Sequence, residues 1–404
     1  MAKNGRSFDR RIWILFWSRM IDGAGYSIVS PFLALYMAED LGTPMTLVGA
    51  VLLVAGVAGA VGSLAGGIAA DAKGRRRVMV ATMLLRCLTF VVLALVVGYL
   101  PDLVLIAAVL SLNFFLGGAF DPANNAMVAD VVEPARHLEA YGLLRVGWNL
   151  GFAVGPAVGG ILASISFALA FICSALVSFV AGLIILLFLQ ESHPSRPTKV
   201  SKGRIADLRS VSLPFLVFCL ICLPMFVMAG QFGTVFPVYS SERLHIESFI
   251  IGVVYGLNGL MVAVLQLPLA HALAPHDMFA SMFFGALLYV MGFFCLAFVG
   301  DGWGLALCMV IITVGEMVVT PVSTSLTAAY SHLEDRGRYM GVFGLIASLG
   351  WFSSSIVGGV VYDNVHDGVL LWGLLSMWGA LTAVGMIFLW RGSRRRALAG
   401  TQVH

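Results

Sequence analysis

Five of the ionisable residues inside long apolar stretches of the sequence stand out as the residues most able to do chemistry. A charged side chain in such surroundings is unfavourable unless it is paired or hydrated, so each one is a candidate functional group. A carboxyl group there can take up and release a proton when the charges around it change. The pattern predicts proton exchange, and the candidates are Arg19, Asp22, Asp121, Arg145 and Glu316.

The spacing of these charges leaves two uses open. Arg19 and Asp22 stand three positions apart, which places them on one helix face as either a neutral structural pair or part of a functional site. Glu316 has no charged neighbour within one helical turn, and we predict that it binds a proton or a cation, although a carboxyl hydrogen-bonded into the packing would fit as well. Both carboxylates lie near the middle of their apolar segments.

Two further groups are less specific. Asp121 precedes Pro122, and a proline loosens a helix, so this pair suits either a hinge or a cavity wall. Asn149 adds a hydrogen-bonding group one turn after Arg145. We include both residues in the predicted proton and substrate site.

The elements that carry these residues are membrane helices. The chain has 404 residues, of which 60% are hydrophobic and 11% charged, and its mean hydropathy is +0.95, which excludes a water-soluble globule. A bilayer-spanning helix needs roughly 20 apolar residues, and lipid satisfies no exposed backbone group, so we predict an all-α integral membrane protein. Twelve helices are expected at 12–37, 46–70, 78–99, 102–130, 141–163, 167–190, 212–239, 248–271, 278–299, 303–331, 340–362 and 368–391.

The distribution of charges and cysteines excludes further classes of protein and site. Lys and Arg gather in alternate loops and at both ends of the chain, which predicts that both termini are cytoplasmic. The net charge of +3 reflects this anchoring and predicts no nucleic-acid partner. All six cysteines lie in apolar segments, so no metal site is expected, and no nucleophile constellation or nucleotide-binding loop indicates an enzyme or a cofactor.

The sequence is internally duplicated. A polar linker at 191–211 separates an N-terminal bundle at 1–190 from a C-terminal bundle at 212–404, each with six predicted helices. A shift of 199 positions superimposes proline and glycine positions of the two halves without a gap. The matched pairs are Pro122 with Pro321, Gly142 with Gly341, Gly151 with Gly350, and Gly159-Gly160 with Gly358-Gly359.

A loop between the second and third predicted helices resembles a known family signature. Its pattern Gly-x-x-x-Asp-x-x-Gly-Arg-Arg runs from Gly67 through Asp71 and Gly74 to Arg75 and Arg76. It resembles the signature loop of the major facilitator superfamily of transporters. The resemblance implies a substrate site between the two halves, and a cytoplasmic latch in which Arg75 faces Asp130 while Asp71 caps the eleventh helix.

The fifth helix carries a second motif, with glycines every fourth residue. Gly-x-x-x-Gly-Pro-x-x-Gly-Gly resembles the motif of drug/proton antiporters in this superfamily, and Gly315-Glu316 followed by Pro321 agrees with it. The predicted fourth helix lacks that family's usual mid-helix arginine, so the basic role is assigned to Arg19 or Arg145. The motif residues are Gly151, Gly155, Pro156, Gly159 and Gly160.

The resemblance implies a monomeric exporter of the cell (inner) membrane. A proton gradient would replace any cofactor, and lipophilic, cationic compounds would leave by alternating access. Proton-coupled import of a small polar solute such as a sugar or peptide is the alternative, and a non-transporting receptor or scaffold is the third. The predicted cavity wall is apolar and adaptable, made of Phe16, Trp17, Tyr26, Phe115, Met225, Met228, Gln231, Phe232 and Phe236.

Overall fold

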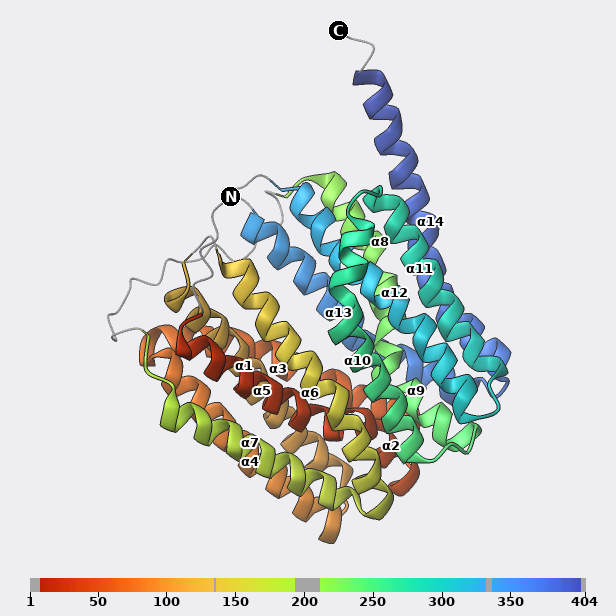
Figure 1. The fold of residues 1–404 in the computed structure, drawn as a ribbon. Helices are drawn as coiled ribbons and strands as arrows, with labels where there is room; N and C mark the ends of the chain where they lie inside the picture. The colour runs from red at the N-terminus through yellow and green to blue at the C-terminus, as the bar shows by residue number, and fades with distance from the viewer. Residues whose placement is uncertain (1–7, 134–135, 193–210, 332–335, 401–404) are drawn as a thin grey trace. The chain divides into compact units, whose positions relative to one another are not determined.

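The computed structural model describes residues 8–133, 136–192, 211–331 and 336–400, and within these ranges it contains helices and no strand. Most of the predicted linker, residues 193–210, lies outside the described part. The α-helices of Figure 1 are α1 (Arg10–Val29), α2 (Leu33–Leu35), α3 (Met45–Lys73), α4 (Arg75–Tyr99), α5 (Leu103–Val131), α6 (His137–Ile165), α7 (Phe167–Phe188), α8 (Leu213–Ala229), α9 (Val235–Val238), α10 (Ser248–Leu273), α11 (Met278–Cys295), α12 (Gly302–Ala329), α13 (Arg336–Asn364) and α14 (Gly368–Gly400).

Eleven helical segments of the described chain are long and apolar enough to cross a membrane. They correspond to the second to twelfth predicted segments, and the predicted all-α membrane fold is confirmed. The first predicted segment contains α1, which is absent from the eleven because Arg10, Arg11, Arg19 and Asp22 reduce its apolar character. Asp9 begins α1 by accepting a hydrogen bond from the backbone N–H of Arg11, and the Arg11 side chain lowers the pKa of the Asp9 carboxyl.

The internal duplication extends to the helix bounds. α13 begins and ends 199 positions after α6 does, and α12 begins 199 positions after α5. The first helix of each half is broken in the same order, by a 3₁₀ turn, a short α-helix and a π turn, so the predicted continuous helices 12–37 and 212–239 are wrong in this detail. Pro31 explains the first break because it lacks a backbone N–H, and the 3₁₀ turn Gly230–Gly233 makes the second.

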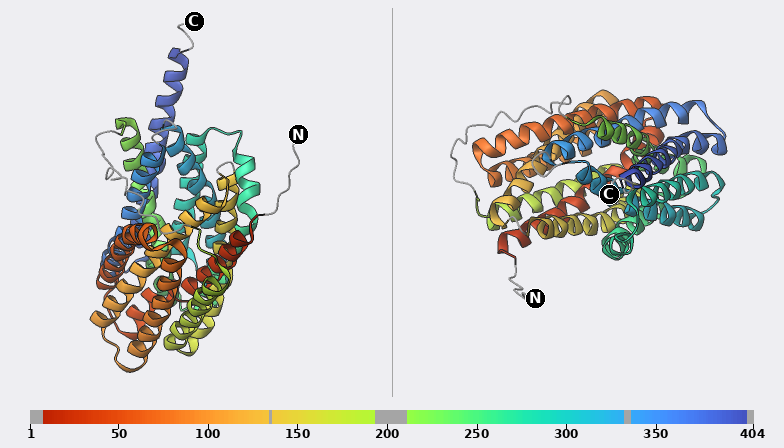
Figure 2. Two further views of the ribbon diagram at one scale, coloured as in Figure 1. Left: turned by 90° about the vertical axis from the view of Figure 1, so that its left-hand side faces the viewer. Right: turned by 90° about the horizontal axis from the view of Figure 1, so that it is seen from above.

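The chain divides into two compact units by its internal contacts. Unit 1 consists of Met1–Leu41, Val51–Ser201 and Glu247–Ala263, and unit 2 of Gly42–Ala50, Lys202–Ile246 and Val264–His404. In unit 1, α1 packs on α6 and α7 while α4 packs on α5 and α7, and Figures 1 and 2 show the red α1 beside the yellow α6. In unit 2, α8 packs on α13 and α14 while α11 packs on α12 and α14, which repeats the scheme of unit 1.

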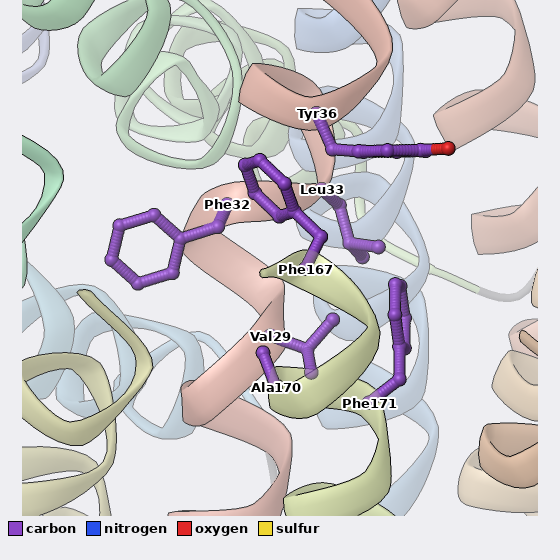
Figure 3. A pocket seen from close by; sticks show the side chains of 7 residues that line it. All are labelled: Val29, Phe32, Leu33, Tyr36, Phe167, Ala170 and Phe171. Atoms are coloured by element: carbon purple, nitrogen blue, oxygen red, sulfur yellow. The ribbon is translucent and has the colours of Figure 1, made fainter. Parts of the chain in front are cut away.

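The core of unit 1 surrounds the first half of α1. Its fully buried members come from α1, α3, α4, α5, α6 and α7, and include Ile12, Leu15, Met79, Met83, Phe120, Met127, Ala140, Ala181 and Ile185. Further along, the broken continuation of α1 packs on α7, where the Tyr36 and Phe167 rings lie 5.0 Å apart. Figure 3 shows the seven side chains that line this crevice. The crevice has no room for a water molecule, so it is packing and not a ligand site.

Candidate functional site

Three helices of unit 1 bring four charged side chains together. Arg19 on α1 reaches Asp121 on α5, with 2.6 Å between Nη1 and Oδ1, and the same Nη1 lies 3.4 Å from Oδ2 of Asp22. Arg86 on α4 holds the other oxygen of Asp22 at 2.5 Å. We call Arg19, Asp22, Arg86 and Asp121 the charge cluster. Two cations and two anions balance, which makes four charges tolerable inside an apolar bundle.

The charge cluster has a closed end and an open end. The side chains of Asp22 and Arg86 are each 5% exposed, whereas those of Arg19 and Asp121 are 20% and 49% exposed. Asp121 is therefore the more exposed of the two carboxylates of the cluster. Asp22 lies between two guanidinium groups, and Asp121 contacts one.

Aromatic rings surround the open end. The guanidinium carbon of Arg19 lies 4.6 Å from the ring centroid of Trp148 on α6 and 5.9 Å from that of Phe120 on α5. Tyr26 on α1 packs against Trp148 with 5.7 Å between ring centroids. Such distances are typical of cation–π contacts, and they fix Arg19 over an aromatic face.

Arg86 is the functional candidate that sequence reasoning missed. It lies inside the predicted third helix, so its charge within an apolar segment was the available signal. The sequence assigned the basic role to Arg19 or Arg145, whereas in the structure α4 supplies the shortest partner of Asp22. Arg145 is exposed on α6 and, within the described part of the chain, pairs with no carboxylate; Asn149 is half-buried one turn further on.

The signature loop forms a second polar cluster in unit 1. Arg75 makes ion pairs with Asp71 at 3.2 Å and with Asp130 at 3.1 Å, so the residues of the predicted latch do meet. Gly74 has a φ of +98°, a conformation that favours glycine, and α4 starts directly after it. Whether these contacts act as a latch stays a prediction, and the residues just before α13, the proposed target of Asp71, lie outside the described part.

Glu191 belongs to this cluster although the sequence placed it in the linker. Its carboxylate accepts hydrogen bonds from the backbone N–H groups of Arg75, at 3.0 Å, and Arg76, at 3.2 Å. It caps the N-terminus of α4, where the helix dipole favours negative charge. The next residue, Ser192, donates a hydrogen bond of 2.7 Å to Asp130. The end of α7 thus fixes both the start of α4 and the end of α5.

Comparison with known proteins decides the family. A sequence profile of the Major Facilitator Superfamily matches residues 15–355. The chain belongs to this superfamily. It is therefore a membrane transporter, and the family that the signature loop predicted is confirmed.

Relatives and solved structures agree with this assignment. The multidrug resistance protein MdtG of Dickeya zeae (strain Ech586) is 27% identical over 82% of this chain and 82% of its own. A Na(+), Li(+), K(+)/H(+) antiporter of Planococcus maritimus is 24% identical over 85% of this chain and 88% of its own. The crystal structure of a mutant of the nucleoside transporter NupG superposes with a TM-score of 0.79 at 14% identity, covering 94% of this chain and 99% of that one, so it shares the fold.

The glycine stripe of this superfamily member, which consists of Gly151, Gly155 and Gly159, packs against α1 inside unit 1. A Cβ atom at Gly151, Gly155 or Gly159 would collide with α1, including the Met20 and Ala24 backbone. The neighbouring face of α6 meets α10, where Gly252 lies against Pro156 and Gly160 against Ser248. Close backbone approach explains the glycines.

Several predicted cavity residues are packed instead. Phe16 belongs to the core of unit 1 and is 7% exposed, while Met225, Met228, Gln231 and Phe236 are at most 1% exposed in unit 2. Gln231 donates hydrogen bonds to the backbone oxygens of Val227 and Ser354, which satisfies its amide. These five side chains are enclosed by packing in this structure, and their role in a cavity wall stays a prediction. Trp17 is exposed, and Tyr26, Phe115 and Phe232 are half-buried.

The remaining candidate, Glu316, lies half-buried on α12 in unit 2. It interacts electrostatically with Tyr289 of the adjacent α11, whose backbone lies against Gly315. Within the described residues, no group of three or more His, Cys, Asp or Glu side chains could hold a metal ion.

Proposed function

We propose that this transporter exports lipophilic cations in exchange for protons, by alternating access. One observation carries the proposal: a single atom, Nη1 of Arg19, lies within ion-pair distance of both Asp121 and Asp22. The Arg19 side chain can pair with either carboxylate without leaving the charge cluster. The accessible carboxylate, Asp121, can then be neutralised by Arg19, by a proton or by a cationic substrate.

Mutual exclusion at Asp121 is what an antiporter requires. A protonated Asp121 attracts no cation, so proton uptake releases the substrate, and loss of the proton restores the negative charge. Asp22 does not need to titrate in this scheme, because Arg86 keeps it paired when Arg19 moves. Glu316 is proposed as the corresponding proton or cation site of unit 2.

The names of two relatives support the proposal. One is a multidrug resistance protein and the other exchanges cations for protons. We further propose that the halves 1–190 and 212–404 rock about the site, that Arg75 with Asp71 and Asp130 stabilises one of the two states, and that both termini are cytoplasmic.

Transport in proteoliposomes tests the proposal. With an acidic lumen, we expect the purified protein to drive ethidium, a lipophilic cation, into the lumen, and a protonophore to stop it. Asp121→Asn should abolish this accumulation, while Glu139→Gln, which neutralises an exposed carboxylate near the start of α6, should retain it. Full ethidium accumulation by Asp121→Asn would refute the exchange at Asp121. Gradient-driven uptake of a dipeptide or sugar without ethidium transport would favour the polar-solute importer.

A further inference from the structure

We infer that Arg19 occupies the place that the cationic group of a substrate takes, so that the transporter carries a built-in competitor for its own ligand. The inference rests on the proposed function and adds the chemical class of the ligand. The site consists of the Asp121 carboxylate, the ring face of Trp148 and the flanking ring of Phe120.

The surroundings of Arg19 are those of a bound organic cation. Its guanidinium stacks on Trp148 at 4.6 Å and forms a 2.6 Å ion pair with Asp121. An aromatic face combined with a carboxylate is the usual way in which proteins bind cationic ligands. A flat cation that replaced the guanidinium would meet both partners in the same arrangement.

Arg86 shows why Arg19, and not any arginine of the cluster, has this role. Arg86 also lies over a ring, 5.7 Å from the centroid of Phe90, and also pairs with a carboxylate, Asp22. Its side chain is 5% exposed, so no ligand can take its place, whereas the partner of Arg19, Asp121, is 49% exposed. When Arg19 leaves, Asp22 is still paired with Arg86. Displacement of Arg19 therefore leaves no buried charge without a partner.

Charge balance makes the displacement competitive. The charged groups around the site are Arg19 and Asp22 on α1, Arg86 on α4 and Asp121 on α5. With all four charged the set is neutral and Asp121 is already paired, so an additional cation finds no unoccupied carboxylate unless Arg19 withdraws. Removal of the Arg19 charge leaves a net charge of one negative unit and an unoccupied carboxylate.

The geometry also selects a class of cation. Asp121 now accepts from an N–H group, and Trp148 presents a flat face, so a planar amidinium or guanidinium on an apolar body fits both. A quaternary ammonium would stack on the ring but has no N–H to donate. We therefore expect N-benzylguanidinium to bind more tightly than benzyltrimethylammonium, and both to bind more tightly than neutral N-benzylurea.

Equilibrium binding to the purified full-length protein in detergent tests the inference, with no proton gradient present. Arg19→Gln should bind N-benzylguanidinium about tenfold more tightly than the wild type, since the competitor is gone. Arg19→Lys retains a cation and should stay near the wild-type affinity. Trp148→Leu should weaken binding about tenfold, both alone and combined with Arg19→Gln.

Two outcomes would overturn the inference. An Arg19→Gln protein that binds N-benzylguanidinium no more tightly than Arg19→Lys would show that Arg19 does not occupy the ligand's place. An equal gain for N-benzylurea would show that the substitution only created space. Because binding is measured without a gradient, the result is independent of ethidium transport: tighter binding without proton-driven transport would refute the exchange mechanism alone.

Discussion

Arg86 Nη1 lies 2.5 Å from Asp22 Oδ1, and this pair joins α4 to α1 in the interior of unit 1 with both side chains 5% exposed. Such a pair contributes little net stability compared with apolar side chains of the same volume, but the loss of one partner leaves a buried charge. The position of α1 therefore depends on Arg86 of α4. Because Arg86 keeps Asp22 paired, Arg19 can contact either Asp22 or Asp121.

The first prediction concerns this buried pair. Arg86→Met should destabilise the protein by about 3–5 kcal/mol, because Asp22 keeps only the longer contact to Arg19. Thermal unfolding in detergent measures the effect. The double variant Arg86→Met with Asp22→Leu should recover much of the loss, since no buried charge is left. A double variant as unstable as the single one would mean that Arg86 acts through packing and not through Asp22.

The second prediction concerns the cap at the start of α4. Glu191→Gln removes the negative charge that two backbone N–H groups share, and should cost about 1 kcal/mol of local stability. Hydrogen exchange of the first turn of α4, read by mass spectrometry, should become faster. Ser192→Ala, which removes a neighbouring hydrogen bond to Asp130 but no cap, should leave that turn unchanged. Equally faster hydrogen exchange in both variants would mean that a disturbed end of α7, and not the loss of the cap, exposes the first turn of α4.

The third prediction tests whether the carboxylate of Glu316 in unit 2 is needed for transport and not for folding. Glu316→Gln keeps the size of the side chain but cannot titrate, so proton-driven ethidium transport should fall to background while the melting temperature stays within a few degrees. Glu247→Gln, at an exposed position just before α10, is the matched control. A full response to the pH gradient in Glu316→Gln would remove Glu316 from the mechanism.

The sequence predicted the parts of this molecule that depend on local composition. Apolar length gives the membrane helices, and the 199-residue shift reappears in the bounds of α6 and α13 because both depend on residue types at fixed positions. The meeting of Arg75 with Asp130 followed from a family signature. Contacts between distant helices were harder: the pairing of Arg86 with Asp22 depends on how α1 and α4 both pack on α5 and α7, which no local pattern contains.

The burial of several cavity-wall candidates could not be predicted for the same reason. Met225 and Met228 lie on α8, an apolar helix whose faces look alike in sequence, and Gln231 lies in the 3₁₀ turn that follows it, so burial could not be assigned to one face. The breaks after α1 and α8 were missed because hydropathy continues through them. Only the packing of α8 on α13 and α14 decides which of its side chains are enclosed.

The last prediction follows from the contact of the glycine stripe with α1. A Cβ atom at Gly155 would lie 2.6 Å from the backbone oxygen of Ala24 and would also collide with Ser27, so Gly155→Leu must push α1 away from α6. We expect a loss of at least about 3 kcal/mol and a lower melting temperature, together with weaker binding of N-benzylguanidinium, because α1 and α6 supply Arg19 and Trp148. Gly142→Leu on the same helix is the matched control, since nothing lies within 4 Å of its Cβ position. A Gly155→Leu protein with normal stability that had lost only transport would show that this stripe serves the movement of the two halves and not the construction of unit 1.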